Sequence, residues 1–169
     1  MRYIIICLLS FWTTMAFAAD NNLDILGTYD NWTAYVYNGT DGKTCYMASE
    51  PTKKQGKYKV RDDVFLFVTH HPTEKSFDVV NVMAGYTYRK GSKPTFTVDN
   101  NKAVSLVSHA DTAWTQDSAT DTKLVAQMKK GSLAVLKGTS ARGTLTTDTF
   151  SMKGFSKAYR DIQKACGRE

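Results

Sequence analysis

The chain has 169 residues, enough for one domain with a hydrophobic core of its own. Its 22 basic and 16 acidic side chains leave a net charge of +6, but the lysines are scattered among acids, which argues against a nucleic-acid-binding protein. No segment after the first twenty residues is apolar enough to span a membrane, and no repeat or low-complexity linker divides the chain.

The first eighteen residues have the pattern of a secretory signal peptide. Arg2 is followed by an apolar run from Tyr3 through Phe11, and then by the small-x-small sequence Ala16-Phe17-Ala18. The run is shorter than the roughly 20 residues that a membrane-spanning helix needs. We therefore expect a cleaved signal over residues 1–18 and a single mature domain over residues 19–169, located in the periplasm, in the cell envelope or outside the cell.

Cysteine usage is the most informative part of the composition. Cys7 would leave with the signal, so that Cys45 and Cys166 remain. An even pair in an exported chain is expected to be oxidised, and this bond would close a loop of about 120 residues. Neither cysteine has further ligands at metal-binding spacing, so we expect no metal site and no cofactor.

The first half of the mature region predicts strands. Residues 32–37 and 44–48 alternate and are rich in aromatic and β-branched residues, and the turn cluster at residues 38–42 joins them into a hairpin. The dense basic run at residues 53–61 follows Pro51 and predicts a solvated loop. The alternative is contact with an anionic surface, such as lipid headgroups or lipopolysaccharide.

More strands follow in the middle of the chain. Residues 64–68 form a short continuous apolar run, which predicts a strand buried on both faces. The next strand covers residues 77–83, with a continuation through residues 85–88 that bends at Gly85. Residues 95–98 and 103–107 then flank a turn and form another hairpin.

Two helices are expected toward the end of the chain. Asp121 can cap a short helix over residues 122–130, with Gly131 as its stop. Apolar residues recur at three- and four-residue steps from Phe155 to Ala165, which predicts an amphipathic C-terminal helix.

Between the two helices, residues 132–137 and 143–151 predict two strands joined by a turn. The whole pattern predicts a mainly β fold. We expect a β-sandwich or flattened barrel of about eight strands, with one short helix and one C-terminal helix whose end is held by the bond between Cys45 and Cys166.

No catalytic constellation stands out. His70 and His71 are adjacent on a strand and should point to opposite faces, while His109 is isolated in a loop. Ser140 lies in a near miss of the Gly-x-Ser-x-Gly elbow, but between two strands, which favours a turn residue. We predict no catalytic residue. The alternative is an envelope hydrolase in which His70 or His71 acts with Asp63 in a cleft.

Aromatic side chains are the remaining candidates for function. Tyr86, Tyr88 and Trp114, together with Trp32, could form a binding face, although aromatic residues in strands more often lie in the core or cover an edge, and Trp32 is expected to be buried in its strand. A second alternative is a carrier of lipid or of a small apolar ligand, which requires an internal cavity.

Several segments, in their order and spacing, are similar to one family. They are residues 32–35, 44–51, 67–70, 84–88, 111–114, 137–144, 148–151, 154–155 and 165–166, including Trp32-Thr33-Ala34-Tyr35, Asp111-Thr112-Ala113-Trp114 and Lys137-Gly138-Thr139-Ser140-Ala141-Arg142-Gly143-Thr144. Together they resemble the invasion-associated locus B family of small exported proteins from Gram-negative bacteria. This resemblance implies a β-sandwich of the periplasm or outer surface and a link to host-cell invasion, and it supplies no catalytic residue.

The chain departs from the better-known members of that family in its cysteines. Those members place a cysteine soon after the opening tryptophan strand and others further along, whereas here only Cys45 and Cys166 follow the signal. The predicted function is that of an exported, non-enzymatic binding or structural protein of the periplasm or envelope that contributes to host-cell interaction. Its partners are expected among bacterial envelope or host components.

Overall fold

The computed structural model describes residues 22–168, so the predicted signal over residues 1–18 lies outside the described residues. Twelve strands, two α-helices and one 3-10 helix occur within them. They are, in chain order, β1 (Leu23–Tyr29), β2 (Trp32–Gly39), β3 (Gly42–Ser49), β4 (Lys53–Gly56), β5 (Phe65–His71), η1 (Pro72–Glu74), β6 (Ser76–Met83), β7 (Thr95–Val98), β8 (Val104–Ser105), β9 (Val107–His109), β10 (Thr112–Trp114), α1 (Ser118–Met128), β11 (Leu133–Thr139), β12 (Leu145–Ser151) and α2 (Phe155–Ala165).

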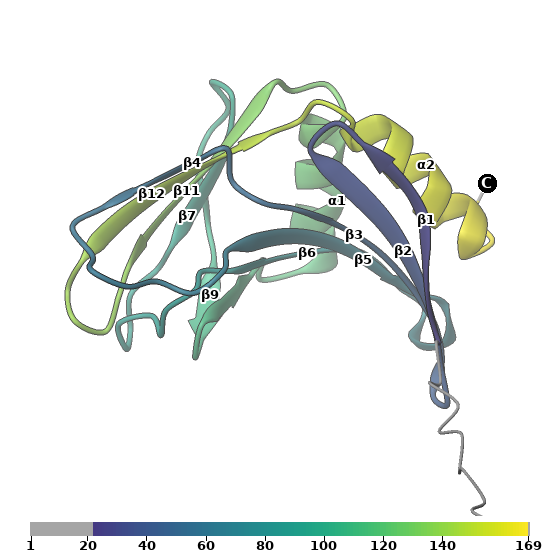
Figure 1. The fold of residues 1–169 in the computed structure, drawn as a ribbon, viewed down its shortest axis with the longest axis horizontal. Helices are drawn as coiled ribbons and strands as arrows, with labels where there is room; N and C mark the ends of the chain where they lie inside the picture. Colours follow the sequence, from purple (N-terminus) through teal and green to yellow (C-terminus); the bar gives the residue numbers. More distant parts are fainter. Residues whose placement is uncertain (1–21, 169) are drawn as a thin grey trace, which may run out of the picture.

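The strands form two separate antiparallel sheets. The first has seven strands in the order β1-β2-β3-β5-β6-β10-β9, and the second has five in the order β4-β12-β11-β7-β8. Figure 1 shows the seven-stranded sheet arching beneath the two helices, with the five-stranded sheet beside it. The predicted mainly β class with a short helix and a C-terminal helix is confirmed. The sheets are not closed into a barrel, and the strands are more numerous than the eight expected.

The core fills the space between the two sheets and the helices. Alternate residues of β2 are buried, beginning with Trp32, whose ring meets Phe155 edge-on at a centroid distance of 4.9 Å. The Trp32 indole Nε1 also donates a hydrogen bond of 2.9 Å to the Ser151 carbonyl. The five-stranded sheet contributes fully buried Phe96, Leu136 and Phe150. Burial of these large apolar side chains is the main stabilising term of the fold.

The C-terminal helix begins and ends where its apolar stripe predicts. Phe155, Ala158, Tyr159 and Ile162 form the buried face of α2, which packs across β1, β2 and β3. The chain enters the helix at Gly154, with φ of +93°, and a Cβ there would lie 1.8 Å from the Tyr29 carbonyl oxygen. Only glycine therefore permits this close approach of backbone to backbone.

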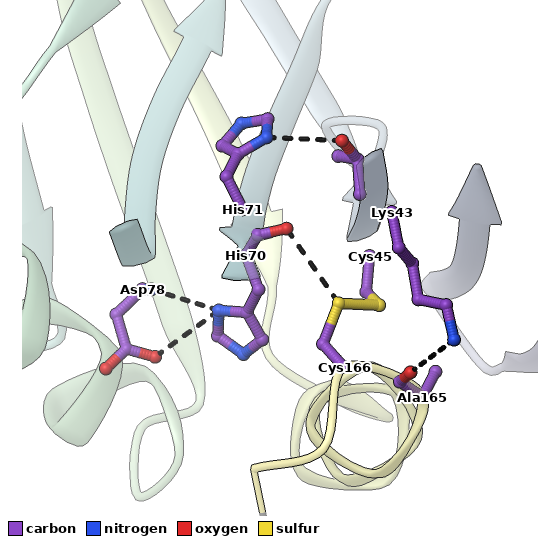
Figure 2. The surroundings of a disulfide bond; sticks show 8 residues. Lys43, Cys45, His70, His71, Asp78, Ala165 and Cys166 are labelled. Atoms are coloured by element: carbon purple, nitrogen blue, oxygen red, sulfur yellow. Dashed lines mark hydrogen bonds and ion pairs between the residues drawn. A yellow bond between two sulfur atoms is a disulfide. The ribbon is translucent and has the colours of Figure 1, made fainter. Parts of the chain in front are cut away.

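The disulfide is present as predicted. Cys45 lies on the buried face of β3 and Cys166 follows the last residue of α2, with Cα atoms 6.0 Å apart (Figure 2). Lys43, on the same strand, donates from Nζ to the Ala165 carbonyl at 3.2 Å. The bond therefore fastens the end of the terminal helix to the middle of the seven-stranded sheet.

The prediction for the start of the first helix was wrong. Asp117, four residues earlier than expected, is the N-cap, and its carboxylate accepts the Thr120 amide at 2.8 Å. Asp121 instead lies buried in the first turn of α1, where it accepts the Val80 amide at 2.8 Å. The short polar Asp121 side chain joins the helix to β6, a long-range role that local capping patterns do not reveal.

Two strand predictions also need correction. The basic run is not entirely loop, because Lys53–Gly56 forms β4 and pairs with β12 at the edge of the five-stranded sheet. Residues 85–88 do not continue β6, because the chain bends at Gly85 and Tyr88 makes a single bridge to Ser140.

The β5 strand is buried on one face only. Leu66, Val68 and His70 are buried, whereas Phe65 and Phe67 are half-buried on the opposite face. That outer face is aromatic: Tyr35 and Tyr46 stack at 4.9 Å, and the rings of Tyr46 and Phe67 follow at 6.4 Å. The mutual packing of these rings accounts for an apolar run that resembles a doubly buried strand.

Candidate functional site

An open pocket of about 530 Å³, which we call the basic pocket, lies among the described residues. Three chain segments line it: residues 57–62 after β4, residues 85–87 after β6, and residues 140–146 at the turn between β11 and β12. The pocket therefore lies where loops from both sheets meet. Rigid strands hold loops of this kind in place, and binding sites are often found there.

A buried ion pair supports the wall of the basic pocket. Arg61 Nη1 and Nη2 donate to the two carboxylate oxygens of Asp148 at 2.7 and 2.6 Å, and Nε donates to the Ala84 carbonyl at 2.7 Å. Side-chain exposure is 3% for Arg61 and 0% for Asp148. The guanidinium also lies over the rings of Tyr58 and Tyr86, 5.4 and 4.9 Å from their centroids. Arg61 is thus fixed in position and orientation.

Two tyrosines predicted as part of a binding face lie at this place. The rings of Tyr86 and Tyr88 meet edge-on at 5.2 Å, and the Tyr86 hydroxyl hydrogen-bonds to Thr146 Oγ1 at 2.6 Å. Burial raises the pKa of both hydroxyls, so both stay neutral. Only Tyr86 lines the pocket, because Tyr88 is 5% exposed. The Tyr88 hydroxyl has no hydrogen-bond partner within residues 22–168.

Trp114 does not join these tyrosines. It lies on β10, opposite Asn81 of β6 and Val107 of β9, and Asn81 in turn lies opposite Phe67. Trp114 therefore belongs to the outer face of the seven-stranded sheet and is 37% exposed. The three predicted aromatics thus lie in two different places and do not form one face.

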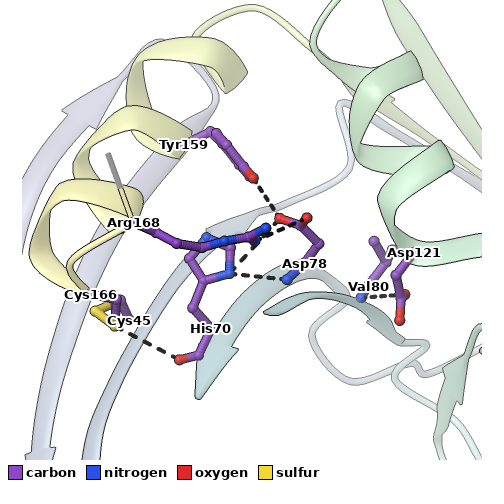
Figure 3. Close-up of polar contacts among 8 residues, drawn as sticks. All are labelled: Cys45, His70, Asp78, Val80, Asp121, Tyr159, Cys166 and Arg168. Atoms are coloured by element: carbon purple, nitrogen blue, oxygen red, sulfur yellow. Dashed lines mark hydrogen bonds and ion pairs between the residues drawn. A yellow bond between two sulfur atoms is a disulfide. The ribbon is translucent and has the colours of Figure 1, made fainter. Parts of the chain in front are cut away.

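His70 is fully buried beneath α2. Its Nδ1 accepts the Asp78 amide at 3.0 Å and lies 4.0 Å from that residue's carboxylate (Figure 3). Tyr159 donates to Asp78 Oδ1 at 2.5 Å, and Arg168 Nη1 lies 3.3 Å from Oδ2. Burial lowers the pKa of His70, against the opposing effect of the Asp78 charge. His70 is therefore a neutral core histidine that helps to join the sheet to the C-terminal helix.

The hydrolase alternative is not supported by the positions of its residues. His71 points to the other face of β5 and hydrogen-bonds to Thr44 Oγ1 at 3.2 Å (Figure 2). Asp63 is exposed just before β5, whereas both histidines are at the far end of that strand. At about 3.3 Å per strand residue, Asp63 and His70 are roughly 20 Å apart. The structure brings neither histidine to Asp63.

Two other candidates can be placed. Ser140 lies at the turn after β11, where its hydroxyl accepts the Thr144 amide at 3.1 Å, a structural role that agrees with the predicted turn residue. His109 ends β9 and is exposed.

Within residues 22–168, no three His, Cys, Asp or Glu side chains come together to hold a metal ion. No helix of this part of the chain is long and apolar enough to cross a membrane.

These features define a class: a two-sheet antiparallel β protein whose C-terminal helix is anchored by a disulfide and which carries a basic, tyrosine-lined pocket. The family model described as Invasion associated locus B (IalB) protein matches residues 32–163. The chain belongs to this family, which confirms the resemblance seen in the sequence. Searches of curated proteins and of solved structures found no match.

The burial of His70 predicts a pH-dependent stability. The unfolded chain takes up a proton at a pKa of about 6.5, whereas folded His70 resists protonation. The free energy of unfolding should therefore fall as the pH drops below about 6.5. The H70Q variant should lose this component, so that urea denaturation at about pH 7 and about pH 5 gives a smaller difference than in the wild type. H109Q, at an exposed site, should keep the wild-type difference, and an unchanged difference in H70Q would contradict the prediction.

Proposed function

We propose that this chain is an exported, non-enzymatic binding or structural protein of the periplasm or cell envelope, and that it contributes to host-cell interaction. The observation that carries the proposal is the disulfide between Cys45 and Cys166. Such bonds persist in oxidising compartments and are rare where thiols are kept reduced. The family match and the signal pattern in residues 1–18 support the same location.

A binding role is favoured over catalysis because the polar side chains that could act in catalysis are already engaged in structural contacts or buried. Arg61 is engaged by Asp148, and the Ser140 hydroxyl holds its own turn. His70 is sealed beneath α2, where a substrate cannot reach it without displacing the helix. The carrier alternative is less well supported, because the basic pocket is open and is rimmed by charged side chains.

Export is tested by expressing the full chain with its own leader in a Gram-negative host and fractionating the cells. We expect the protein in the periplasmic or envelope fraction, with a mass that has lost residues 1–18 and two hydrogens. A matched variant, A18Y, should keep the leader because the peptidase accepts only a small residue there. Recovery of full-length wild type in the cytoplasm with free thiols would overturn the proposal.

Binding is tested on the protein recovered from that fraction. Labelled protein should bind saturably to bacterial envelope preparations or to host-cell membranes, and excess unlabelled protein should displace it. Heat-denatured protein of the same concentration serves as the control for nonspecific adsorption. Absence of saturable binding to both preparations would contradict a binding role.

A further inference from the structure

We propose that the basic pocket binds a phosphate monoester group, an inference that rests on the proposed binding function. Four cationic side chains line it, namely Lys57, Lys59, Arg61 and Arg142, against the single carboxylate of Asp62. Asp148 cancels one further charge from behind Arg61. Four positive and two negative charges leave a local charge of +2. A phosphate monoester carries about −1.5 to −2 near neutral pH and would neutralise it.

The arrangement is prepared before any ligand arrives. Arg61 has five N–H donors. Asp148 and the Ala84 carbonyl use three of them, and a side-chain hydrogen bond with Tyr58 engages a fourth, which leaves one for a ligand. Two tyrosine rings hold the guanidinium in place. A fixed arginine loses little conformational entropy when it donates to phosphate oxygens, and arginine suits the geometry of that group.

Threonine hydroxyl groups add further hydrogen-bond donors to the basic pocket, and its donors come from separate segments of the chain. Thr87 and Thr144 line the same pocket and offer hydroxyl groups to phosphate oxygens, whereas the buried Thr146 hydroxyl is paired with Tyr86. The cations come from two segments far apart in the sequence, residues 57–61 and the turn that carries Arg142. A site assembled from distant segments is more than a run of basic residues along the chain.

Lysines in the basic run of residues 53–61 could instead serve only to protect an exposed sheet edge, but this explanation fits only two of them. Lys53 and Lys54 lie on the exposed edge strand β4, where lysine prevents pairing with other chains. Lys57 and Lys59 lie beyond the end of that strand and line the pocket. Protection of the sheet edge therefore does not account for them, nor for Arg142.

The test titrates the oxidised protein, recovered after export, with defined probes. These are inorganic phosphate, a hexose 6-phosphate, and phosphatidylcholine vesicles with or without phosphatidic acid, whose headgroup is a phosphate monoester. We expect saturable binding of a monoester probe, with amide NMR shifts confined to residues 57–62, 85–87 and 140–146. The K57A/R142A variant should bind about tenfold or more weakly. The control K102A/K123A removes the same charge at exposed sites outside the pocket and should bind like the wild type.

The probes separate the possible sources of the phosphate. Saturable binding of the hexose 6-phosphate supports a soluble ligand, and binding only to vesicles that contain phosphatidic acid supports a lipid headgroup. Failure to bind any monoester probe, or equal binding by K57A/R142A and wild type, overturns the inference. The unfolding free energy of K57A/R142A is measured in parallel to show that it is folded.

The experiment also separates this inference from the proposed function. If no monoester probe binds the wild type, or if K57A/R142A binds it equally well, while the wild type is exported, oxidised and bound saturably by envelope or host membranes, the phosphate site is refuted and the binding function stands. If the wild type remains in the cytoplasm with free thiols, the proposed function fails, whatever the phosphate probes show.

Discussion

Replacing Cys45 and Cys166 together by alanine is expected to lower the free energy of unfolding by about 2–5 kcal/mol. The two residues are 121 positions apart, so the bond removes a large amount of chain entropy from the unfolded state. It also fixes the last turn of α2, which otherwise would fray from the sheet. Denaturant unfolding of the oxidised wild type and of the double variant measures the difference.

Two controls make this result specific. Reduced wild type should unfold with nearly the same free energy as the double alanine variant, because both lack the cross-link. C7A, which changes a cysteine of the predicted signal, should leave the mature protein unaffected. A loss below about 1 kcal/mol in the double variant would show that the bond contributes little to stability.

The second large effect is expected at the ion pair beneath the basic pocket. Asp148→Leu or Arg61→Met should each cost about 3–5 kcal/mol, because each leaves the partner's charge buried without compensation. Removal of the Arg61 guanidinium also takes away its contacts with the rings of Tyr58 and Tyr86, so the R61M variant should have a less rigid pocket wall. Chemical denaturation of the single variants, monitored by circular dichroism, measures these costs.

The double variant R61M/D148L distinguishes an unpaired charge from general damage. With both charges removed, most of the stability should return, since a buried pair replaced by apolar side chains is often neutral. The double variant should then lose at least about 4 kcal/mol less than the sum of the two single losses. Additive losses in R61M/D148L would mean that the two residues stabilise the fold independently.

The parts of the fold that could be predicted are those with a local signal. The apolar stripe of Phe155–Ala165 has helical spacing, and the structure begins and ends α2 at the same residues. The disulfide could be predicted because only two cysteines remain after the predicted signal, so they can pair only with each other. The β2–β3 hairpin has alternating strands around an evident turn. In each case a short stretch of sequence carries the pattern.

Other elements depend on partners far away in the chain. Every residue of β4 is exposed, so it has no alternation, and it is a strand only because it pairs with β12 about ninety residues later. Asp121 could not be placed from local sequence because its buried carboxylate serves Val80, 41 residues earlier. β1 has exposed apolar residues and a register shift between Ile25 and Gly27, which conceal its periodicity.

The candidate site was only partly visible in the sequence. Arg61 was seen as one member of a basic run, and its partner Asp148, 87 residues away, could not be assigned to it. Tyr86 was singled out as an aromatic candidate, but nothing local distinguishes it from buried Tyr88. One available signal was missed: the alternation of Leu66 and Val68 extends to His70, which places that histidine inward.

The position of the cross-link has a consequence for how an exported chain matures. Under the proposed export, which would begin at the N-terminus, Cys45 would reach the oxidising side before Cys166, which follows it by 121 positions. Cys45 would then keep a free thiol until the residue after the last turn of α2 has also crossed, so the cross-link would be among the last bonds of the molecule to form.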